Sequence, residues 1–464
     1  MCSHGVVVVP GVELEDTSLH FASSWWAMRE TWLKPGVARR EFWAWASLDF
    51  ANSGYTTVVL TAVFNAYFVA TVMQGAAQAT LVWTLVLAVS YLLVMLTAPL
   101  LGAYADLRAK KKWLLVASTV GCVVCTALLA TVGPGMLAWA CVLLIVSNFC
   151  FATHQDMTAA FLPELASDEH VGRVSGYGWA WGYLGGLTAL GLALAWVMQA
   201  QSMGRDAQTV VGGTMIMTAV LFSVVALLAL SVLRERAVPE ALGEPLRASQ
   251  WVEKSWGRLS VTWHLSKSQP DLRRFLVCVL VYHAGVQTVI ALAAVYAQEV
   301  MGFSMPQTIA LILVVNITAA AGAWVFGFVQ DRVGHKRSLM LALMAWIAMV
   351  VVAWQADTEA MFWIAANFAG LAMGASQSGA RAAVAHLARP GHEAETFGLW
   401  GVAVNLSAIL GPVTYGVVTW ATNNAHRLAM LATGTFFVVG LVLLARVDFQ
   451  RGYSDSRNDL MRGQ

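Results

Sequence analysis

The sequence predicts an all-α polytopic membrane protein with twelve transmembrane helices in two six-helix pseudo-repeats. Of its 464 residues, 58% are apolar and only 12% are charged, which is too little charge to cover a soluble protein of this size. The apolar residues gather in runs of about 20, the length at which a helix crosses about 30 Å of hydrocarbon. The sequence has none of the alternating segments of about 10 residues that are typical of membrane barrels.

Twelve helical spans follow one another along the chain. The first, fourth and tenth are the most polar and are recognised mainly as members of the series. Because the number of spans is even, we expect both termini on one side of the membrane. The spans cover residues 43–70, 79–104, 113–132, 136–161, 172–199, 210–233, 274–298, 306–328, 338–355, 360–386, 395–420 and 427–447.

The basic residues indicate which side that is. Of the 28 Lys and Arg residues, all but Arg205 and Arg427 fall in segments on the side of the termini. Such a split predicts a multi-pass protein of the cytoplasmic (inner) membrane with both termini in the cytoplasm. The basic residues therefore reflect topology and do not indicate a nucleic-acid partner. Phosphate-binding loops, zinc spacings and nucleophile elbows are absent from the sequence, so we expect no enzyme, cofactor or metal site.

A polar segment divides the spans into two sets of six. Residues 1–40 contain eight charged residues and no long apolar run, so they are expected to form a cytoplasmic tail and not a signal peptide. Residues 41–233 and 274–447 are the two expected bundles, and residues 448–464 a second cytoplasmic tail. The linker, 234–273, carries apolar residues at helical spacing and predicts a short helix on the inner membrane surface.

The two halves repeat a loop between their second and third helices. The first copy is "GAYADLRAKKK" (102–112) and the second is "GFVQDRVGHKR" (327–337). An acidic residue at a helix end, followed by cations, suits a conditional ion pair with a neighbouring helix end. Glycine allows close approach of backbones. The expected gating residues are Gly102, Asp106, Arg108, Lys111, Gly327, Asp331, Arg332, Gly334, Lys336 and Arg337.

This repeated loop resembles the signature of the major facilitator superfamily, in which it restrains the change between inward- and outward-facing states. The second copy matches fully, whereas the first has Leu107 in place of Arg and Ala109 in place of Gly. The stretches "EFWAWASLDFANSGYTTVVL", "AAFLPELA", "GRVSGYGWAWGYLGG", "GVQTVIALAAVYAQEVMGF" and "HEAETFGLWGV" further resemble the bacterial branch of the family that contains the autophagy-related vacuolar amino-acid effluxers.

The narrower resemblance implies a permease, with amino acids as the first substrate class. The chain departs from the family at several polar positions. Where the family often has an Asn-Asp pair, this chain has His283 and Ala284. It also has Ala159 in place of Asn, alanines on both sides of Arg381 in place of Ser, and Asn405 in place of Lys. Several of these differences remove groups that could contact a substrate or an ion.

A polar stripe begins the first span. Asp49, Asn52, Ser53 and Thr56 follow one another at i, i+3, i+4 and i+7, which puts them on one face of a helix. A charge facing lipid at this depth would be costly, so the stripe should face protein or a water-filled cavity. Two interpretations stay open: an aspartate that hydrogen-bonds near the end of the helix, or a residue of the substrate or proton pathway.

Other polar residues, most of them in the inner half of the membrane and Asn405 nearer its midplane, complete the candidate pathway. Arg381 stays charged and needs an acceptor, unless it extends to the interface. The histidines suit either packing or proton linkage. We hypothesise that Asp49 and Arg381 approach each other when the two bundles close on the inner side. The further candidates are His154, Asp156, His283, Gln287, Gln377 and Asn405.

Together these features predict a secondary transporter that works by alternating access. The expected substrate is a small polar molecule, and the alternative is a proton-coupled exporter of hydrophobic or amphipathic compounds, suggested by 20 Trp and 19 Met. A non-transporting membrane sensor on the same scaffold is a third interpretation. A coupling proton and membrane lipid are the other expected partners, and we expect a monomer.

Overall fold

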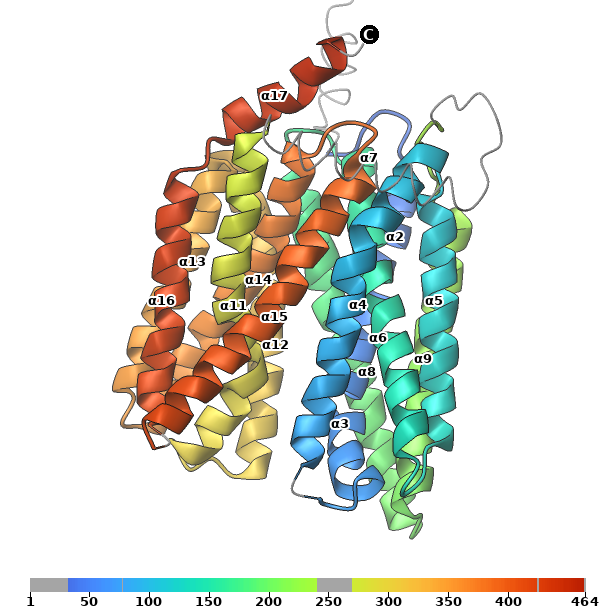
Figure 1. The fold of residues 1–464 in the computed structure, drawn as a ribbon, viewed down its shortest axis with the longest axis vertical. Helices are drawn as coiled ribbons and strands as arrows, with labels where there is room; N and C mark the ends of the chain where they lie inside the picture. The colour runs from blue at the N-terminus through green and yellow to red at the C-terminus, as the bar shows by residue number, and fades with distance from the viewer. Residues whose placement is uncertain (1–31, 77, 240–268, 424, 463–464) are drawn as a thin grey trace, which may run out of the picture.

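The computed structural model describes residues 32–462 except 77, 240–268 and 424, and this part of the chain is almost entirely helical (Figure 1). The first half contains α2 (Arg39–Gly54), η1 (Tyr55–Ala62), α3 (Phe64–Tyr67), η2 (Phe68–Val72), α4 (Ala79–Arg108), α5 (Lys111–Leu128), η3 (Leu129–Thr131), α6 (Leu137–Ala160), α7 (Leu162–Leu165), α8 (Val171–Ser202) and α9 (Ala207–Val232). The second half contains α11 (Pro270–Glu299), α12 (Met305–Val333), α13 (His335–Gln355), α14 (Glu359–Leu387), α15 (Glu393–Ala421) and α16 (His426–Ala445), followed by α17 (Phe449–Arg462).

The predicted fold class is confirmed, with one helix that hydropathy alone does not identify. Eleven helical segments among the described residues are long and apolar enough to cross a membrane. The twelfth, α14, falls short because it is rich in Ala, Gly and Ser and carries Arg381. Most of its residues are buried against neighbouring helices, so α14 needs less apolar surface toward lipid.

The first span contains two π-helical segments that the sequence did not indicate. After α2 the chain widens into η1, passes through the short α3 and widens again into η2. A π-helix leaves a wider, less regular hydrogen-bond ladder, and such segments are frequent at functional sites. The first span is therefore the least regular spanning segment of the described chain.

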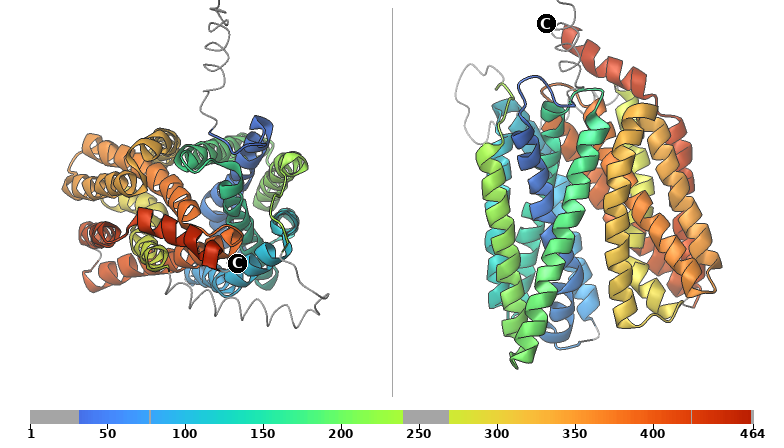
Figure 2. Two further views of the ribbon diagram at one scale, coloured as in Figure 1. Left: turned by 90° about the horizontal axis from the view of Figure 1, so that it is seen from above. Right: turned by 180° about the vertical axis from the view of Figure 1, so that it is seen from behind.

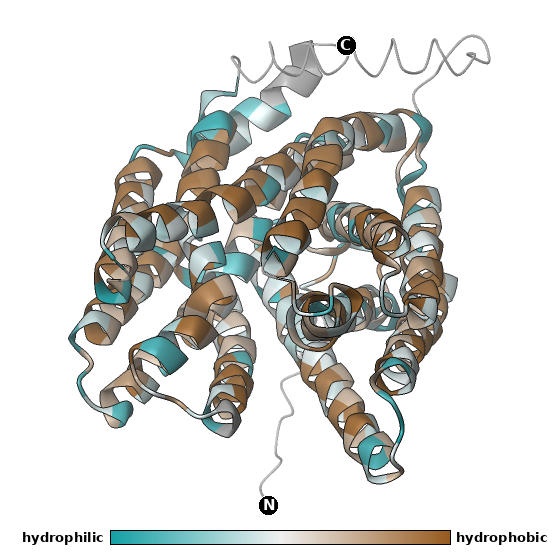
Figure 3. Ribbon diagram, turned by 60° about the horizontal axis from the view of Figure 1, so that its bottom comes forward, coloured by the Kyte–Doolittle hydropathy of each residue, from teal (hydrophilic) through white to brown (hydrophobic). Residues whose placement is uncertain are grey.

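The repeated loops of the two halves lie at the same end of the bundle. We call this the basic end; α2, α5, α8, α11, α13 and α15 begin there, and α17 lies across it (Figures 1 and 2). Hydrophilic residues gather at the helix ends, and hydrophobic residues cover much of the helices between them (Figure 3). This pattern is expected of helices surrounded by hydrocarbon.

Two helix pairs join the halves most extensively. α8 packs along α12, and α4 packs along α15. In the first pair Gly172 and Gly327 oppose each other, and a Cβ on Gly327 would lie 3.0 Å from the Gly172 carbonyl oxygen. In the second pair a Cβ on Gly102 would overlap the backbone of Ala394. Both close approaches lie near the basic end, so the halves meet most tightly there.

The polar segments outside the bundles are only partly described. The expected surface helix of the linker lies outside the described residues, as does most of the N-terminal tail. The expected C-terminal tail contains α17, which the sequence analysis did not identify. Phe449 of α17 packs on Phe275 with ring centroids 5.3 Å apart, and Arg451 Nη2 donates to Asp271 Oδ1 at 2.8 Å. α17 therefore docks on the start of α11.

Candidate functional site

Asp49 and Arg381 form a buried ion pair between the two halves. Asp49 lies on α2 and Arg381 on α14, and their side chains meet with Nη1 donating to Oδ2 at 2.6 Å. Asp49 is 7% exposed and Arg381 is 2% exposed. The structure thus brings the two residues into the contact that the sequence hypothesis requires, while their role in transport stays a prediction.

Helix α8 completes the surroundings of the guanidinium group. Arg381 Nε donates to Ser175 Oγ at 3.1 Å, and Nη2 donates to the Ser175 carbonyl at 2.9 Å. The rings of Trp45 and Trp179 lie 4.8 and 5.4 Å from the guanidinium carbon, within range of a cation–π interaction. These contacts hold the cation at the boundary between α2, α8 and α14, so moving one half away would break several bonds at once.

One turn deeper, a second polar contact joins the halves. Tyr183 of α8 donates its hydroxyl to Gln377 Oε1 of α14 at 2.7 Å. Ser175 also donates to the Ser378 carbonyl at 2.7 Å. Among the described residues, no hydrogen bond or ion pair between the halves lies nearer the opposite end than Tyr183 and Gln377. Polar contacts between the halves in the described part of the chain therefore extend from the basic end to the level of Tyr183 and Gln377 and not beyond it.

The other members of the predicted stripe behave differently from Asp49. Ser53 donates to the Asp49 carbonyl on its own helix at 2.8 Å. Asn52 is buried, and its Nδ2 has no hydrogen-bond partner. Thr56 falls in η1 and is exposed. Only Asp49 of the stripe contacts the second half through a hydrogen bond.

The remaining candidates are spread over the bundle. His154 is buried within the first half, where its Nδ1 lies 2.9 Å from Thr119 Oγ1 and its ring contacts Phe222. His283 on α11 is buried with Nδ1 unpartnered, and Gln287 is half-buried one turn on. Asn405 donates to the Gly401 carbonyl of its own helix at 2.7 Å. The structure therefore does not gather these residues with the Asp49–Arg381 pair.

The first gating loop binds the start of α15. Asp106 accepts the backbone N–H groups of Ala394 at 3.2 Å and Glu395 at 2.8 Å. The Lys111 ammonium, 1% exposed, lies 3.5 Å from Asp106, 3.0 Å from Glu164 and 2.9 Å from Glu393. A carboxylate at a helix N-terminus is favoured by the helix dipole. Lys111 of α5 thus connects α4 and α7 of the first half with the start of α15 in the second half.

The second gating loop binds the start of α8, as the first loop binds the start of α15. Asp331 accepts the Arg173 N–H at 3.1 and 3.2 Å, and Arg173 stands 4.8 Å from the Phe328 ring. Lys336 donates to the Ala445 and Val447 carbonyls at 2.6 and 3.0 Å, which caps the end of α16. Arg332 and Arg337 are exposed, Arg108 is half-buried, and Gly334 takes a left-handed backbone with φ +86°. Each loop thus meets the opposite half at a helix start.

The family model for proteins like the vacuole effluxer Atg22 matches residues 37–457. The chain belongs to the Atg22-like vacuole effluxer family. This Atg22-like chain is 25% identical over 426 residues to the uncharacterized MFS-type transporter YxiO of Bacillus subtilis strain 168, covering 90% of this chain and 97% of YxiO. It is 27% identical over 228 residues to autophagy-related protein 22 of Cryptococcus neoformans, which is 45% of this chain and 41% of that protein.

Solved structures show the same fold at low identity. The Atg22-like chain matches the human organic anion transporter MFSD10 with a TM-score of 0.69 and 15% identity, covering 88% of this chain and 99% of MFSD10. It matches FucP in the outward conformation with a TM-score of 0.65 and 14% identity, covering 88% of this chain and all of FucP. The fold is therefore that of the major facilitator superfamily (MFS), and this protein is an MFS-type membrane transporter.

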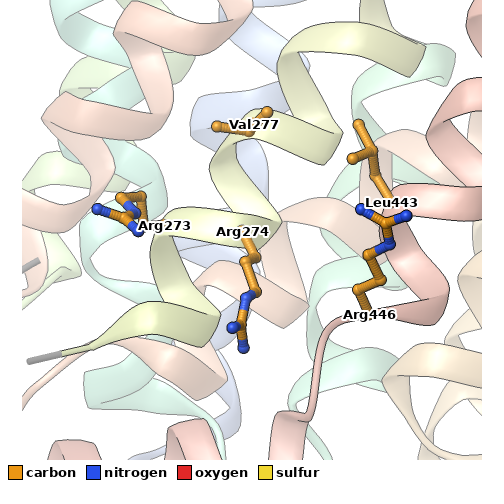
Figure 4. Close-up of a pocket in the computed structure, with 5 residues that line it drawn as sticks. All are labelled: Arg273, Arg274, Val277, Leu443 and Arg446. Carbon is orange, nitrogen blue, oxygen red and sulfur yellow. The ribbon is translucent and has the colours of Figure 1, made fainter. Parts of the chain in front are cut away.

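A shallow hollow on the Atg22-like fold lies away from these contacts. It is lined by Arg273, Arg274, Val277, Leu443 and Arg446, at the basic end of α11 and α16 (Figure 4). Arg274 is partly neutralised, because Nη1 donates to Asp271 Oδ1 at 3.2 Å. None of the predicted site residues lines this hollow, so it is separate from the boundary between the halves.

Several residues that hold the Atg22-like site together were not predicted. Ser175, Tyr183 and Glu393 touch candidate residues across the boundary between the halves. Glu235, at the end of the first bundle, accepts the Lys111 and Lys112 N–H groups at 2.7 and 3.1 Å, and burial raises the pKa of its carboxyl group. Short polar side chains are common on membrane helices, so composition gave no signal that these residues were special.

Proposed function

We propose that this MFS-type protein is a secondary transporter of small polar solutes, with zwitterionic amino acids as the first class. The observation that carries the proposal is the Asp49–Arg381 pair, a carboxylate and a guanidinium buried between two bundles. A buried ion pair stays favourable only while both partners are present, and removing one costs about 3–5 kcal/mol. Separation of the bundles therefore requires new partners for both charges.

A zwitterionic amino acid offers the two charges that the separated pair would lack. Its ammonium group complements the Asp49 carboxylate, and its carboxylate complements the Arg381 guanidinium group. The guanidinium group is planar and can donate two parallel hydrogen bonds to a carboxylate. Water filling the opened space could satisfy the same groups, in which case the pair is a gate and not the substrate site. In both versions the two bundles separate. They differ in whether Asp49 and Arg381 then bind the substrate or water.

The basic end is proposed to face the cytoplasm. The support is the distribution of Lys and Arg, which favours the cytoplasmic side in membrane proteins. With that orientation, the contacts at the basic end correspond to a molecule closed to the cytoplasm. Transport would then proceed through loss of the Asp49, Asp106 and Asp331 contacts.

The test is a substrate screen with the purified chain in liposomes. Radiolabelled amino acids, small sugars and lipophilic cations are offered with and without an imposed pH gradient. We expect accumulation of at least one amino acid, and loss of that accumulation in Asp49→Asn. Accumulation of the lipophilic cations alone would favour the exporter instead. If no compound is accumulated and none raises the unfolding temperature, the proposal is wrong and a sensor role gains support.

A further inference from the structure

Asp156 is a buried carboxyl group without a partner. It lies near the end of α6 and is 4% exposed. Its Oδ2 is sealed from solvent, and no hydrogen-bond donor lies within reach of that atom. No ion pair among the described residues includes it. The contrast with Asp49 is direct, because Asp49 accepts a hydrogen bond from Arg381.

The two halves close around this carboxyl group. Gly401 of α15 faces it, and a Cβ at that position would lie 2.5 Å from Oδ2 and 2.8 Å from Oδ1. Asn405, one turn further along α15, donates its amide to the Gly401 carbonyl and so does not serve Asp156. The carboxyl group is therefore enclosed only while α6 of the first half and α15 of the second stay together.

The charged groups on the helices packed against α6 are paired with other residues or lie at helix ends away from Asp156. On α6 itself, His154 Nδ1 lies 2.9 Å from Thr119 Oγ1 while its Nε2 has no hydrogen-bond partner among the described residues, and Arg39 and Arg40 are exposed at the start of α2. On α2, Glu41 pairs with Arg236 and Asp49 pairs with Arg381. Lys111 of α5 faces Asp106 of α4, Glu164 of α7 and Glu393 of α15, and Lys112 donates to the Leu233 carbonyl. On α15, Glu395 pairs with His392, and Arg108 is half-buried at the end of α4.

An ionised carboxylate in such a place would carry a large desolvation penalty that no cation offsets. A protonated carboxyl group avoids most of that penalty. We propose that Asp156 binds the coupling proton, and that the basic end of the bundle closes only when Asp156 is protonated. When α6 and α15 separate, water reaches the group and the proton can leave.

The chemistry is a reversible proton transfer and nothing else. One O–H bond forms on Asp156 as a hydronium ion gives its proton to the carboxylate and becomes water, and the same bond breaks when a water molecule takes that proton back. Both transfers need α6 and α15 to separate, so protonation of Asp156 is linked to opening of the basic end. The inference rests on the proposed transport function for calling this the coupling proton, but the link between protonation and closure needs no substrate.

The experiment measures closure directly in the full-length chain. The six native cysteines are replaced, and spin labels are placed at Glu169 and Arg446, which are exposed on opposite halves at the basic end. Label distances are recorded in lipid nanodiscs from pH 5 to pH 9. We expect the short, closed distance at low pH and a longer one at high pH. For one proton, the ratio of the two populations should change by up to about tenfold per pH unit.

Asp156→Asn mimics the protonated group and should keep the short distance at every pH. The matched control is Asp357→Asn, a carboxylate that is 78% exposed at the opposite end, and it should leave the pH profile unchanged. A full pH-dependent opening in Asp156→Asn would overturn the proposal. So would a shift between sodium and choline chloride at constant pH, because that result would assign the site to a metal cation.

A second variant keeps the test decisive if Asp156→Asn is not monodisperse. Gly401→Ala places a methyl group against the carboxyl group and should favour the longer distance at low pH as well. An unchanged distance profile in Gly401→Ala would then overturn the proposal. Both distance measurements are independent of the liposome screen. If no compound is accumulated but the pH profile depends on Asp156, only the transport function is contradicted. If a compound is accumulated but the pH profile does not depend on Asp156, only the proton site is contradicted.

Discussion

Single charges at the boundary between the halves are held in two different ways. Arg381 and Asp49 neutralise each other in a setting nearly closed to water, whereas Lys111 faces three carboxylates. Removing one member of a buried pair leaves its partner unpaired, which costs more than the pair itself contributes. Single substitutions at these positions should therefore act strongly on the closed state.

The first prediction concerns the buried pair. Asp49→Asn should abolish substrate-driven transport while leaving inserted, folded protein, because Arg381 loses the one carboxylate that pairs with it in the described part of the chain. The closed state should lose about 3–5 kcal/mol relative to the open one, measured as a longer distance between labels at the basic end. Asp357→Asn, at the exposed pair with Arg427, should change stability by no more than about 1 kcal/mol.

The double variant separates the two versions of this site. Asp49→Asn with Arg381→Gln removes both charges, so exchange between conformations should recover if the residues form a gate. Transport should remain absent if they bind the substrate. Full transport by Asp49→Asn alone would contradict both versions and leave the aspartate as a structural residue.

A second prediction at this scale concerns Ala109 in the first gating loop. Its φ is +51°, a left-handed conformation that costs a residue with a Cβ about 1–2 kcal/mol. The second loop has Gly334 where the signature expects glycine, with φ +86°. Ala109→Gly should relieve the strain at some cost in unfolded-state entropy, for a net gain of up to about 1 kcal/mol. A lower unfolding temperature for Ala109→Gly would show that this residue is not strained.

The elements at the basic end connect the halves through helix starts. The α15 start is capped by Asp106 of the first half, and the α8 start is capped by Asp331 of the second. The two contacts differ in burial and in partners, because only Asp106 also faces Lys111. The two loops are thus related in sequence but not equal in strength.

We predict that Asp331→Asn slows transport while substrate affinity changes by no more than a few fold, because the residue biases the conformational equilibrium and does not touch the site. Asp106→Asn should act in the same direction and more strongly. Exchange rates and binding constants in liposomes give the two quantities separately. Loss of binding with unchanged turnover of bound substrate would contradict a gating role for either loop.

α17 adds a third connection at this end. Tyr453 donates its hydroxyl to Asp168 Oδ2 of the first half at 2.6 Å, and its ring stacks on His386 of the second half at 4.6 Å. Arg457 donates to the Ala388 carbonyl at 3.2 Å. The helix therefore touches both halves from the outside.

Removal of residues 449–464 should shift the bundle toward opening at the basic end, because these contacts with both halves disappear. The distance between labels at Glu169 and Arg446 reports the shift. Tyr453→Phe is the finer variant: it keeps the ring and loses only the hydrogen bond to Asp168, so its effect should be the smaller one. Identical distances in the truncated and full-length chains would exclude a role for α17 in closure.

At the scale of the whole molecule, the Lys and Arg distribution assigns a direction to the bundle. We predict that both termini and the linker face the cytoplasm. Reporter fusions at residues 20, 255 and 460 should be active only with a reporter that works in the cytoplasm. A periplasmic signal at any of these positions would contradict the twelve-span topology.

The architecture was predictable because it rests on features that repeat. Apolar runs of sufficient length, one basic side and two copies of a loop were enough for twelve helices in two halves, and the position of the repeat identified α14 where hydropathy did not. Asp49 and Arg381 stood out because charges in apolar spans need partners.

Other features depend on partners that composition does not reveal. The π-helices in the first span follow from packing, and α17 has too few apolar residues to be recognised as a helix before its docking surface is known. The isolation of Asp156 is a property of its surroundings, in which no described residue donates a hydrogen bond to its Oδ2. A sequence gives the charge of such a residue but not what faces it.

The contact of α17 with the loop before α8 also makes this state recognisable from outside. Tyr453 and Asp168 come from distant parts of the sequence and lie together in this state, in which the basic end is closed. An antibody fragment that binds both segments at once would recognise one conformation and reject the other. Selected against the full-length chain, such a reagent would hold the transporter in a single state for imaging, and its binding in lipid would count the fraction of closed molecules under any condition.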